Sequence, residues 1–377
     1  MIVPPDCIGI MGGGQLARML AISARQMGYL VAILEPSDNS PAQPFANYYI
    51  KTRYDDELGL DQLAKVSSVI TTEFENVPAS SMEYLAKLIP THPNHTAISV
   101  CQNRIAEKDF FNANSIPTTR YTSISNLADI NQVDHDLFPA LLKTNTLGYD
   151  GKGQIRVDNQ TELQAAFLQL NNQPCILEKL VTLQLEVSIM VARSKNEIAC
   201  YPVVQNIHKN GILDITLAKA QLDTNMQQQI VDAANRIVQQ LDYIGILGIE
   251  FFITADNKIL ANEIAPRPHN SGHYTLDACV TSQFEQQLRA ICDLKLGNTH
   301  MHSQAVMLNL LGDIWLDKHQ HPAWQKVLGK YANAKLHLYD KTDASVGRKM
   351  GHLTLLGNDI DVLYKQAFEI KEILNIK

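Results

Sequence analysis

The chain has 377 residues, of which 45% are hydrophobic and 19% charged, and its formal net charge is −7. This length allows two or three domains with large cores, and the composition is ordinary for a globular protein. The negative charge argues against broad binding to nucleic acid or anionic membranes, and no apolar run is long enough to span a bilayer. The amino terminus has no signal pattern and the six cysteines are scattered, so we expect a reduced, cytoplasmic protein.

The first third of the chain alternates between strand and helix. Short apolar strands are predicted at Cys7–Met11, Leu30–Leu34 and Ser68–Thr72, and an amphipathic helix follows the first of them and ends at Gly28. A strand, helix, strand rhythm of this kind implies parallel strands in a doubly wound sheet.

The turn after the first strand is rich in glycine. Residues 12–17 fit the pattern Gly-x-Gly-x-x-Ala of dinucleotide-binding proteins, and Glu35 follows where a ribose-binding acid would be, so an NAD-dependent oxidoreductase is one interpretation. A glycine turn at a helix N-terminus binds any phosphate, however, and the glycines also serve turn geometry alone. Glu73 and Glu75 end the third strand, either at a ligand-binding edge of the sheet or in a solvated loop.

A second glycine-rich segment, Leu147–Gln154, lies between the predicted strands Pro139–Lys143 and Ile155–Val157. Its three glycines predict a mobile hairpin loop whose N–H groups can fold over a polyphosphate, while Lys143 and Lys152 neutralise charge. The segment is not a Walker loop, because the Gly-Lys-Ser/Thr ending is absent. A flexible glycine hairpin without a ligand is the alternative.

Two carboxylates lie in a predicted hairpin further along the chain. The apolar runs Gly248–Ile253 and Lys258–Ala261 are separated by the turn signal Asp256–Asn257. Pairing of these strands would bring Glu250 and Glu263 side by side, an arrangement that suits a hard cation such as magnesium. The alternative is a solvated glutamate on each strand.

The segment Asn262–His273 follows directly and is crowded with polar groups. Two prolines stiffen its backbone. Its polar side chains after the second carboxylate are Arg267, His269, Asn270, Ser271 and His273.

The remaining chain is predicted to form strands at Ala305–Leu311, Lys335–Tyr339 and His352–Leu356, and a final helix at Asp359–Leu374. A local basic cluster in this acidic protein comprises Lys341, Arg348 and Lys349. It indicates either an anion site or a solvated basic loop.

Five motifs occur in one order along the chain, and together they resemble the ATP-grasp superfamily. They are Gly12–Arg18, Thr72–Asn76, Gly148–Gln154, Asn262–His273 and Arg348–His352. Within the superfamily the chain resembles the family of 5-(carboxyamino)imidazole ribonucleotide synthetases of purine biosynthesis, from Gly9 to about Leu356. It departs from the family pattern at Leu147 and Ala17, each of which replaces a common glycine.

The resemblance implies a mixed α/β and α+β architecture with the ATP-grasp fold. A Rossmann-like (pre-ATP-grasp) parallel-sheet domain would span residues 1–105, an ATP-grasp domain 106–300 with a lid subdomain at about 115–180, and a small β-rich C-terminal domain 301–377. The implied activity is an ATP-dependent ligase that carboxylates 5-aminoimidazole ribonucleotide through carboxyphosphate. Its implied cofactors are ATP and Mg²⁺, its partners are the ribonucleotide and bicarbonate, without nucleic acid or membrane, and its state is a homodimer.

Two further alternatives stay open at this point. One is the formate-using ATP-grasp enzyme that formylates glycinamide ribonucleotide, although Gln15 and the ending Asn270–His273 favour the carboxylating family. The other is a non-catalytic nucleotide sensor, which the presence of both Glu250 and Glu263 disfavours.

The resemblance also assigns roles to individual residues. ATP would be bound by Arg104, Lys143, Gly148, Tyr149, Asp150, Gly151, Lys152, Gly153, Gln154, Glu178, Lys179, Leu180, Val181, Glu186, His208, Asn262 and Glu263. Magnesium would be bound by Glu250 and Glu263. The catalytic residues would be Arg267, His269 and Tyr149, of which the first two would handle bicarbonate and carboxyphosphate. The ribonucleotide would meet Gln15, Glu73, Tyr149, Asp150, Asn270, Ser271, Lys341 and Arg348.

Overall fold

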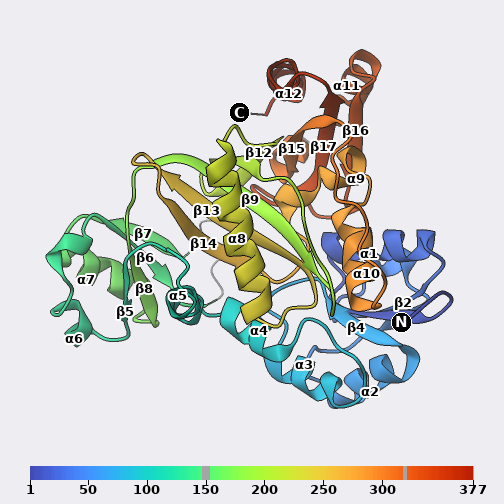
Figure 1. Ribbon diagram of the computed structural model, residues 1–377, viewed down its shortest axis with the longest axis horizontal. Helices are drawn as coiled ribbons and strands as arrows, with labels where there is room; N and C mark the ends of the chain where they lie inside the picture. The colour runs from blue at the N-terminus through green and yellow to red at the C-terminus, as the bar shows by residue number, and fades with distance from the viewer. Residues whose placement is uncertain (147–152, 317–320, 377) are drawn as a thin grey trace.

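The structure, a computed structural model, describes residues 1–146, 153–316 and 321–376, and this part of the chain folds around three sheets (Figure 1). The first sheet contains β1 (Cys7–Met11), β2 (Leu30–Leu34), β3 (Tyr48–Ile50) and β4 (Val69–Thr72) in the order β3-β2-β1-β4, and all its pairings are parallel. The three predicted strands and their parallel pairing are confirmed. Strand β3 was not predicted from the sequence, because three residues are too few to show a periodicity.

Helices cover both faces of this sheet. They are α1 (Gln15–Gln26), α2 (Glu57–Val66), α3 (Ala79–Ala86) and α4 (His95–Cys101), with α10 (Gln283–Ile291) joining from far along the chain. Ile8 and Ile10 of β1 pack with α1 and α10, whereas Cys7 and Met11 point to the other face and pack with α2, α3 and α4. The alternation of side chains along β1 therefore fills two cores, which confirms the doubly wound sheet.

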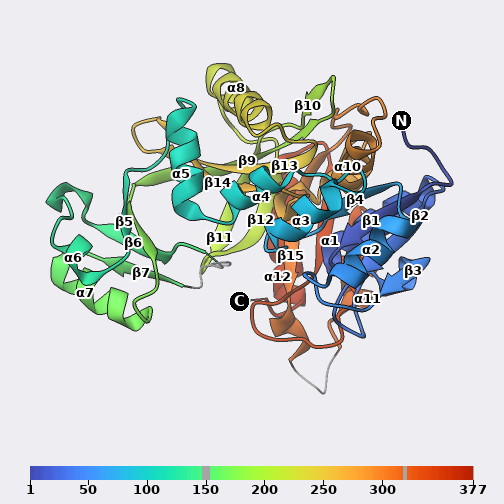
Figure 2. The same cartoon turned by 90° about the horizontal axis from the view of Figure 1, so that it is seen from below.

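The second sheet is antiparallel and forms the part of the molecule at the left of Figures 1 and 2. It contains β5 (Tyr121–Ile124), β6 (Ala140–Thr144), β7 (Gln154–Val157) and β8 (Cys175–Lys179), in the order β5-β8-β6-β7. Helices α6 (Leu127–Ile130) and α7 (Gln160–Gln169) pack on it around Leu142, Phe167 and Leu177. Helix α5 (Arg104–Ala113) connects the first sheet to this part.

The third sheet has nine strands in the described part of the chain. They are β9 (Leu183–Arg193), β10 (Ile198–Cys200), β11 (Val204–Lys209), β12 (Ile212–Ala218), β13 (Gly245–Thr254), β14 (Ile259–Ala265), β15 (Gln304–Leu311), β16 (Ala334–Leu338) and β17 (Lys349–Gly357). The order is β14-β13-β9-β11-β12-β15-β17-β16, with β10 pairing with β9. The C-terminal strands thus extend the same sheet that begins with the hairpin, and the domain limits at 105 and 300 stay predictions.

The helices that flank the third sheet are α8 (Thr224–Gln240), α9 (Thr275–Ala278), α11 (Trp324–Lys330) and α12 (Ile360–Ile373). Helix α8 buries an apolar stripe, which includes Ile230, Ala234 and Ile237, against β9 and β13. Within the described ranges no helix is both long and apolar enough to cross a membrane.

The predicted hairpin is confirmed by the pairing of β13 with β14, in which Glu250 lies directly opposite Glu263. The register then shifts: Phe251 pairs with Ala261, so Asn262 is an extra residue on β14. This is a β-bulge, which re-aims the side chains around it.

Candidate active site

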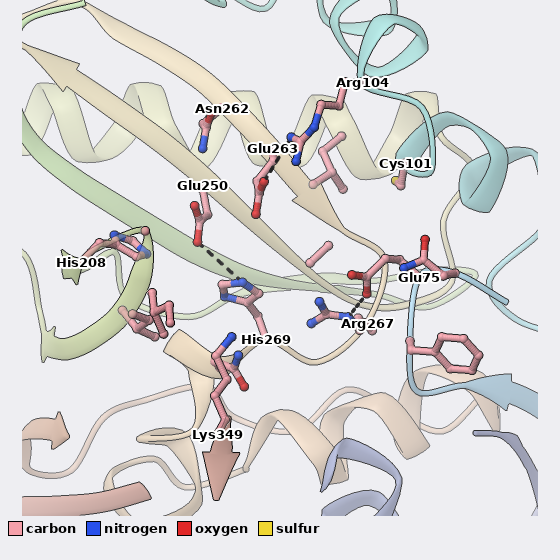
Figure 3. Close-up of a pocket in the computed structure, with 18 of the residues that line it drawn as sticks. Glu75, Cys101, Arg104, His208, Glu250, Asn262, Glu263, Arg267, His269 and Lys349 are labelled. Carbon is pink, nitrogen blue, oxygen red and sulfur yellow. Dashed lines mark hydrogen bonds and ion pairs between the residues drawn. The ribbon is translucent and has the colours of Figure 1, made fainter. Parts of the chain in front are cut away.

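A cavity of about 950 Å³ lies where the three sheets meet (Figure 3). Predicted site residues on its wall are Gln15, Glu73, Arg104, Lys143, Gln154, Glu186, His208, Glu250, Asn262, Glu263, Arg267, His269, Asn270, Lys341 and Arg348. They come from both ends of the chain and from the hairpin at its centre. The fold therefore brings most of the predicted site together in one place.

Other predicted residues lie elsewhere. Gly148, Tyr149, Asp150, Gly151 and Lys152 fall outside the described residues. Gly153 closes the β6–β7 connection by accepting a hydrogen bond from Thr144 N–H (2.9 Å). Lys179 ends β8 and is followed by Leu180 and Val181, and all three are half-buried. Glu178 and Ser271 are buried and are not on the cavity wall.

The carboxylate pair occupies the middle of the cavity. Glu250, Glu263 and His269 each offer one atom, and these atoms lie within 4.8 Å of one another. Burial and then the charge of Glu263 raise the pKa of Glu250 to about 7. Two carboxylates that repel each other in this way fit a divalent cation, whose charge would favour ionisation of both. The residues present are therefore suited to magnesium.

The bulge in β14 directs two consecutive side chains into this cavity. Neighbouring residues of a regular strand point to opposite faces of a sheet, yet Asn262 and Glu263 both line the cavity wall (Figure 3). The extra residue at position 262 is what permits this arrangement.

Helix α5 holds the bulge from behind with two buried side chains. Lys108 Nζ donates to the carbonyl of Asn262 (2.9 Å), and Glu107 Oε1 accepts from the N–H of Ile264 (2.6 Å). Lys108 also lies 3.6 Å from Glu178 Oε2, although burial lowers the pKa of the lysine. Neither residue was predicted from the sequence, because charged side chains near a helix start are normally solvated.

Ion pairs line the part of the cavity that faces the second sheet. Lys143 Nζ lies 3.1 Å from Glu178 Oε1, and His208 Nδ1 lies 2.9 Å from Glu186 Oε2. Burial alone would raise the pKa of Glu178, but Lys143 and Lys108 lower it to about 2. A phosphate chain entering here would meet fixed positive charge from Lys143.

Arg267 is joined to the first sheet by Glu75. The guanidinium donates from Nε to Glu75 Oε2, and both residues are on the cavity wall (Figure 3). Burial acts to raise the pKa of Glu75, yet the charge of Arg267 lowers it to about 2. From the sequence, Glu75 was predicted to end the third strand but was not assigned to the site, because its partner Arg267 lies in a distant segment.

His269 is fixed at its backbone and at its ring. Gln283 of α10 accepts from the His269 N–H and donates to the His269 carbonyl, each at 2.9 Å. The ring has Nδ1 2.8 Å from Ser271 Oγ and Nε2 3.6 Å from Glu250 Oε1. Burial, and then the charge of Arg267, lowers the pKa of His269 well below its usual value. Gln283 has no local sequence signature and was missed.

The glycine turn differs from the expectation of an open anion site. The N–H of Gly13 donates to Glu35 Oε2 (2.9 Å), and the N–H groups of Gly14 and Ala17 donate to the carboxylate of Glu73 (3.0 and 3.3 Å). The chain's own carboxylates thus occupy the groups that would bind a dinucleotide phosphate. Gly13, Gly14 and Ala17 therefore offer no free N–H group to an anion in this structure, whereas the contact of Gln15 with the ribonucleotide stays a prediction.

The basic cluster lies on the wall of the same cavity as Gln15 and Glu73. Lys341 Nζ donates to the carbonyl of Lys349 (2.7 Å), and Arg348 donates to the carbonyl of Asp343. All three basic residues line the cavity, and Arg348 is exposed to solvent there. The anion site at this cluster stays a prediction.

Comparisons with known families agree with this architecture. The family described as the ATP-grasp domain matches residues 109–284, and the ribonucleotide synthetase preATP-grasp domain matches residues 6–102. The phosphoribosylaminoimidazole carboxylase C-terminal domain matches residues 305–366. Fold and site therefore define an ATP-grasp protein.

Individual relatives show which family within the ATP-grasp proteins this chain resembles. The N5-carboxyaminoimidazole ribonucleotide synthase of Brucella melitensis is 43% identical over 362 residues, which cover 93% of this chain and 96% of the relative. The synthase of Bacillus subtilis is 39% identical over 358 residues, covering 94% and 93%. This chain belongs to the N5-carboxyaminoimidazole ribonucleotide synthase family, as the sequence motifs predicted.

Solved structures support the same conclusion. The ADP complex of an N5-carboxyaminoimidazole ribonucleotide synthetase aligns with a TM-score of 0.93 at 39% identity, covering 100% of this chain and 98% of the other. The synthase of Aspergillus clavatus in complex with ADP and 5-aminoimidazole ribonucleotide aligns with a TM-score of 0.91 at 31% identity, covering 98% of each chain.

Proposed function

We propose that this protein is an ATP-grasp ligase that uses ATP and bicarbonate to carboxylate the exocyclic amine of 5-aminoimidazole ribonucleotide. The product, N5-carboxyaminoimidazole ribonucleotide, belongs to purine biosynthesis. One observation carries the proposal: a single cavity holds the carboxylate pair, Arg267 and His269, and the basic cluster of the C-terminal strands. The names of the relatives and the ligands of the Aspergillus clavatus complex support the same substrates.

ATP is proposed to bind between the second and third sheets. Lys143 would neutralise phosphate charge, Asn262 and Glu263 would face the phosphates, and the segment after β8 would meet the base. Magnesium held by Glu250 and Glu263 would supply charge neutralisation between the phosphates. The chain's contribution here is position and charge, because phosphoryl transfer needs little covalent chemistry from the protein.

The carboxyl transfer is proposed to take place beside Arg267 and His269. A bicarbonate oxygen attacks the γ-phosphorus and ADP leaves, which gives carboxyphosphate. The amine nitrogen of the ribonucleotide then takes up the carboxyl group, the C–O bond to phosphate breaks, and the amine loses a proton. Arg267 would hold the anionic reactant, and a cavity closed to water would protect the labile acyl phosphate.

The ribonucleotide is proposed to lie between the two ends of the chain. Gln15, Glu73 and Asn270 line the cavity together with Lys341 and Arg348. Since the N–H groups of the glycine turn are engaged, positive charge for the ribonucleotide phosphate comes from the basic cluster. The resemblance to the family also leads us to propose a cytoplasmic location and a homodimer. Analytical ultracentrifugation would test the dimer.

The decisive experiment measures phosphate release from ATP with the aminoimidazole ribonucleotide and bicarbonate omitted in turn, together with incorporation of labelled bicarbonate. We expect labelled product only when ATP, bicarbonate and the ribonucleotide are all present. Formate-dependent turnover of glycinamide ribonucleotide would instead favour the formylating relative. Micromolar NADH binding in a parallel fluorescence titration would contradict the occupied glycine turn.

A further inference from the structure

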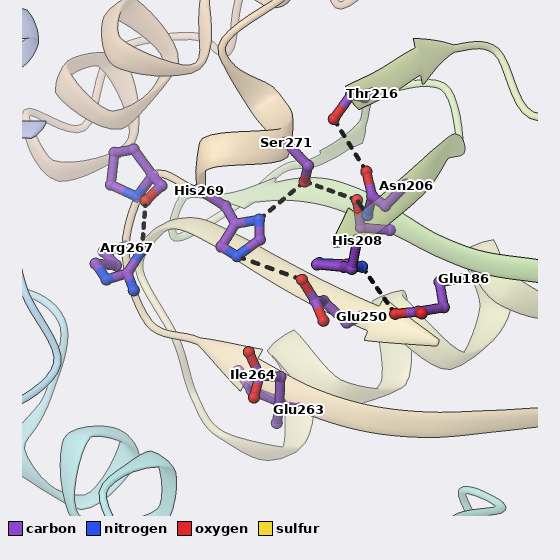
Figure 4. Close-up of polar contacts among 12 residues, drawn as sticks. Glu186, Asn206, His208, Thr216, Glu250, Glu263, Ile264, Arg267, His269 and Ser271 are labelled. Carbon is purple, nitrogen blue, oxygen red and sulfur yellow. Dashed lines mark hydrogen bonds and ion pairs between the residues drawn. The ribbon is translucent and has the colours of Figure 1, made fainter. Parts of the chain in front are cut away.

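A row of hydrogen-bonded, buried polar side chains crosses three neighbouring strands of the third sheet and ends at His269 (Figure 4). Its members are Thr216 on β12, Asn206 on β11, Ser188 on β9, and Ser271 in the segment after β14. Consecutive members are joined at 3.1 Å (Thr216 Oγ1 to Asn206 Oδ1), 2.9 Å (Asn206 Nδ2 to Ser188 Oγ) and 2.7 Å (Ser188 Oγ to Ser271 Oγ). All four are at most 4% exposed, so water does not compete for these bonds.

The bonds of this row have a direction. The amide oxygen of Asn206 can only accept, so the Thr216 hydroxyl donates to it and thereby orients the amide. The amide nitrogen consequently donates to Ser188 Oγ. The Ser188 hydroxyl also bonds Ser271 Oγ, and either hydroxyl can be the donor. A Ser188 hydroxyl that accepts from the amide has its own proton available for Ser271, and this is the direction that our proposal uses.

The direction reaches the ring of His269. With Ser188 as the donor, Ser271 accepts that bond and directs its own hydroxyl proton to His269 Nδ1 at 2.8 Å. A ring nitrogen that accepts a hydrogen bond has no proton of its own, and the neutral imidazole therefore carries its proton on Nε2. Nε2 faces the cavity, 3.6 Å from Glu250 Oε1.

The ring is also packed so that this direction is preserved. A Cβ at Gly248 of β13 would lie 2.6 Å from His269 Cβ, so only glycine lets the histidine approach the strand. Gln283 fixes the backbone of His269 on the opposite side with two hydrogen bonds. The cross-strand pairing of Asn206 with Thr216 fixes the start of the row in the same way.

We propose that Thr216, Asn206, Ser188 and Ser271 are positioning residues that hold His269 as its Nε2–H tautomer. His269 is then a hydrogen-bond donor to an anionic oxygen of the bicarbonate or acyl phosphate class, and its Nε2 is neither a base nor a metal ligand. This inference rests on the proposed function for the identity of the anion. It also moves Ser271 from the predicted ribonucleotide contacts to the support of His269.

The substitution Asn206→Asp tests the direction directly. A carboxylate at this position only accepts, so Ser188 must donate to it, Ser271 must donate to Ser188, and His269 must donate from Nδ1. We expect ¹⁵N NMR of the histidine rings, with the His269 signals assigned by their loss in His269→Gln, to show Nε2–H in the wild type and Nδ1–H in Asn206→Asp. The expected kcat falls on the order of a hundredfold, as for loss of one preorganised donor, with KM for ATP and for the ribonucleotide within about twofold.

Asn309→Asp is the matched control. Asn309 lies on β15, is buried to the same 4% exposure as Asn206, and donates to the Leu213 carbonyl outside the row. We expect this variant to keep the wild-type tautomer and kcat. A similar loss in both variants would assign the effect to a buried acid in general and overturn the proposal.

Two further variants cover the case in which Asn206→Asp does not fold. Thr216→Val removes the donor that orients the amide, and Ser271→Ala removes the partner of Nδ1, so each should give a mixture of the two tautomers. A wild-type ring protonated on Nδ1, or an unchanged tautomer in all folded variants, overturns the proposal. The NMR measurement needs no substrate, so an absence of carboxylation by the wild type would count against the proposed function alone.

Discussion

Arg267 and Glu75 form an ion pair between segments 192 residues apart in the sequence. Arg267 follows the last strand of the hairpin, and Glu75 follows β4 of the first sheet. This ion pair therefore connects the carboxyl edge of the parallel sheet to the end of the β13–β14 hairpin. It also holds the Arg267 guanidinium in place on the cavity wall.

This pair predicts an acid-sensitive contribution to stability. The pKa of Glu75 is about 2 in the folded chain against a usual 4.5, so the stabilisation is complete above about pH 4.5 and is lost as the pH falls toward 2. Glu75→Gln should lower the free energy of unfolding at pH 7 by about 3 kcal/mol and reduce its decrease between pH 5 and 3. Urea unfolding at several pH values measures the free energy of unfolding and its dependence on pH. As control, Asp55→Asn at the exposed Arg53–Asp55 pair should change little.

The carboxylate pair predicts a severe loss in Glu263→Gln. The amide keeps the size of the side chain but removes a charged ligand, so turnover should fall on the order of a hundredfold or more while the circular dichroism spectrum and Tm stay close to wild type. Steady-state kinetics over a magnesium titration is the measurement. Activity near that of the wild type at modest magnesium would exclude Glu263 as a ligand.

The support of the bulge predicts a defect in Lys108→Met. The variant keeps the aliphatic stem but leaves the Asn262 carbonyl without its donor, so Asn262 and Glu263 should lose their shared direction into the cavity. We expect KM for magnesium–ATP to rise on the order of tenfold, with KM for the ribonucleotide within about twofold, since loss of a charged hydrogen bond is worth about 1.5–3 kcal/mol.

Lys371→Met controls for the loss of a buried lysine. Lys371 lies on α12 and pairs with Asp214 at 2.5 Å, outside the cavity wall as the structure describes it. The Lys371→Met variant should have a lower Tm but an unchanged KM for ATP and for the ribonucleotide. Equal kinetic effects in both lysine variants would contradict a specific role for Lys108.

The basic cluster predicts a substrate-selective effect at Arg348. A planar guanidinium can bind two phosphate oxygens at once, which an ammonium group cannot, so Arg348→Lys should raise KM for the ribonucleotide and Arg348→Ala should raise it further. The KM for ATP should stay within about twofold, because the phosphates of ATP are proposed to lie near Lys143. A raised KM for ATP with an unchanged KM for the ribonucleotide would show that the basic cluster binds ATP instead.

Local pattern was enough to predict several elements of this protein. The β13–β14 hairpin joins residues close in sequence, so alternation and one turn signal predicted that Glu250 and Glu263 would be neighbours, and the pairing confirms it. The parallel sheet followed from three apolar runs and the spacing of one helix. The order of five motifs predicted the family.

Tertiary structure alone decided how the polar groups are partnered. Whether a glutamate is solvated, caps a turn like Glu73, or holds a distant arginine like Glu75 depends on which segments the fold brings against it. Lys108, Gln283 and Asn206 look like ordinary polar residues in the sequence, because burial and hydrogen-bond direction are properties of packed neighbours. The sequence by itself determined the family, the parallel sheet of β1, β2 and β4, and the carboxylate pair. The tautomer that we propose for His269 depends instead on the sheet order β9-β11-β12, because the side chains that support it come from three separate strands.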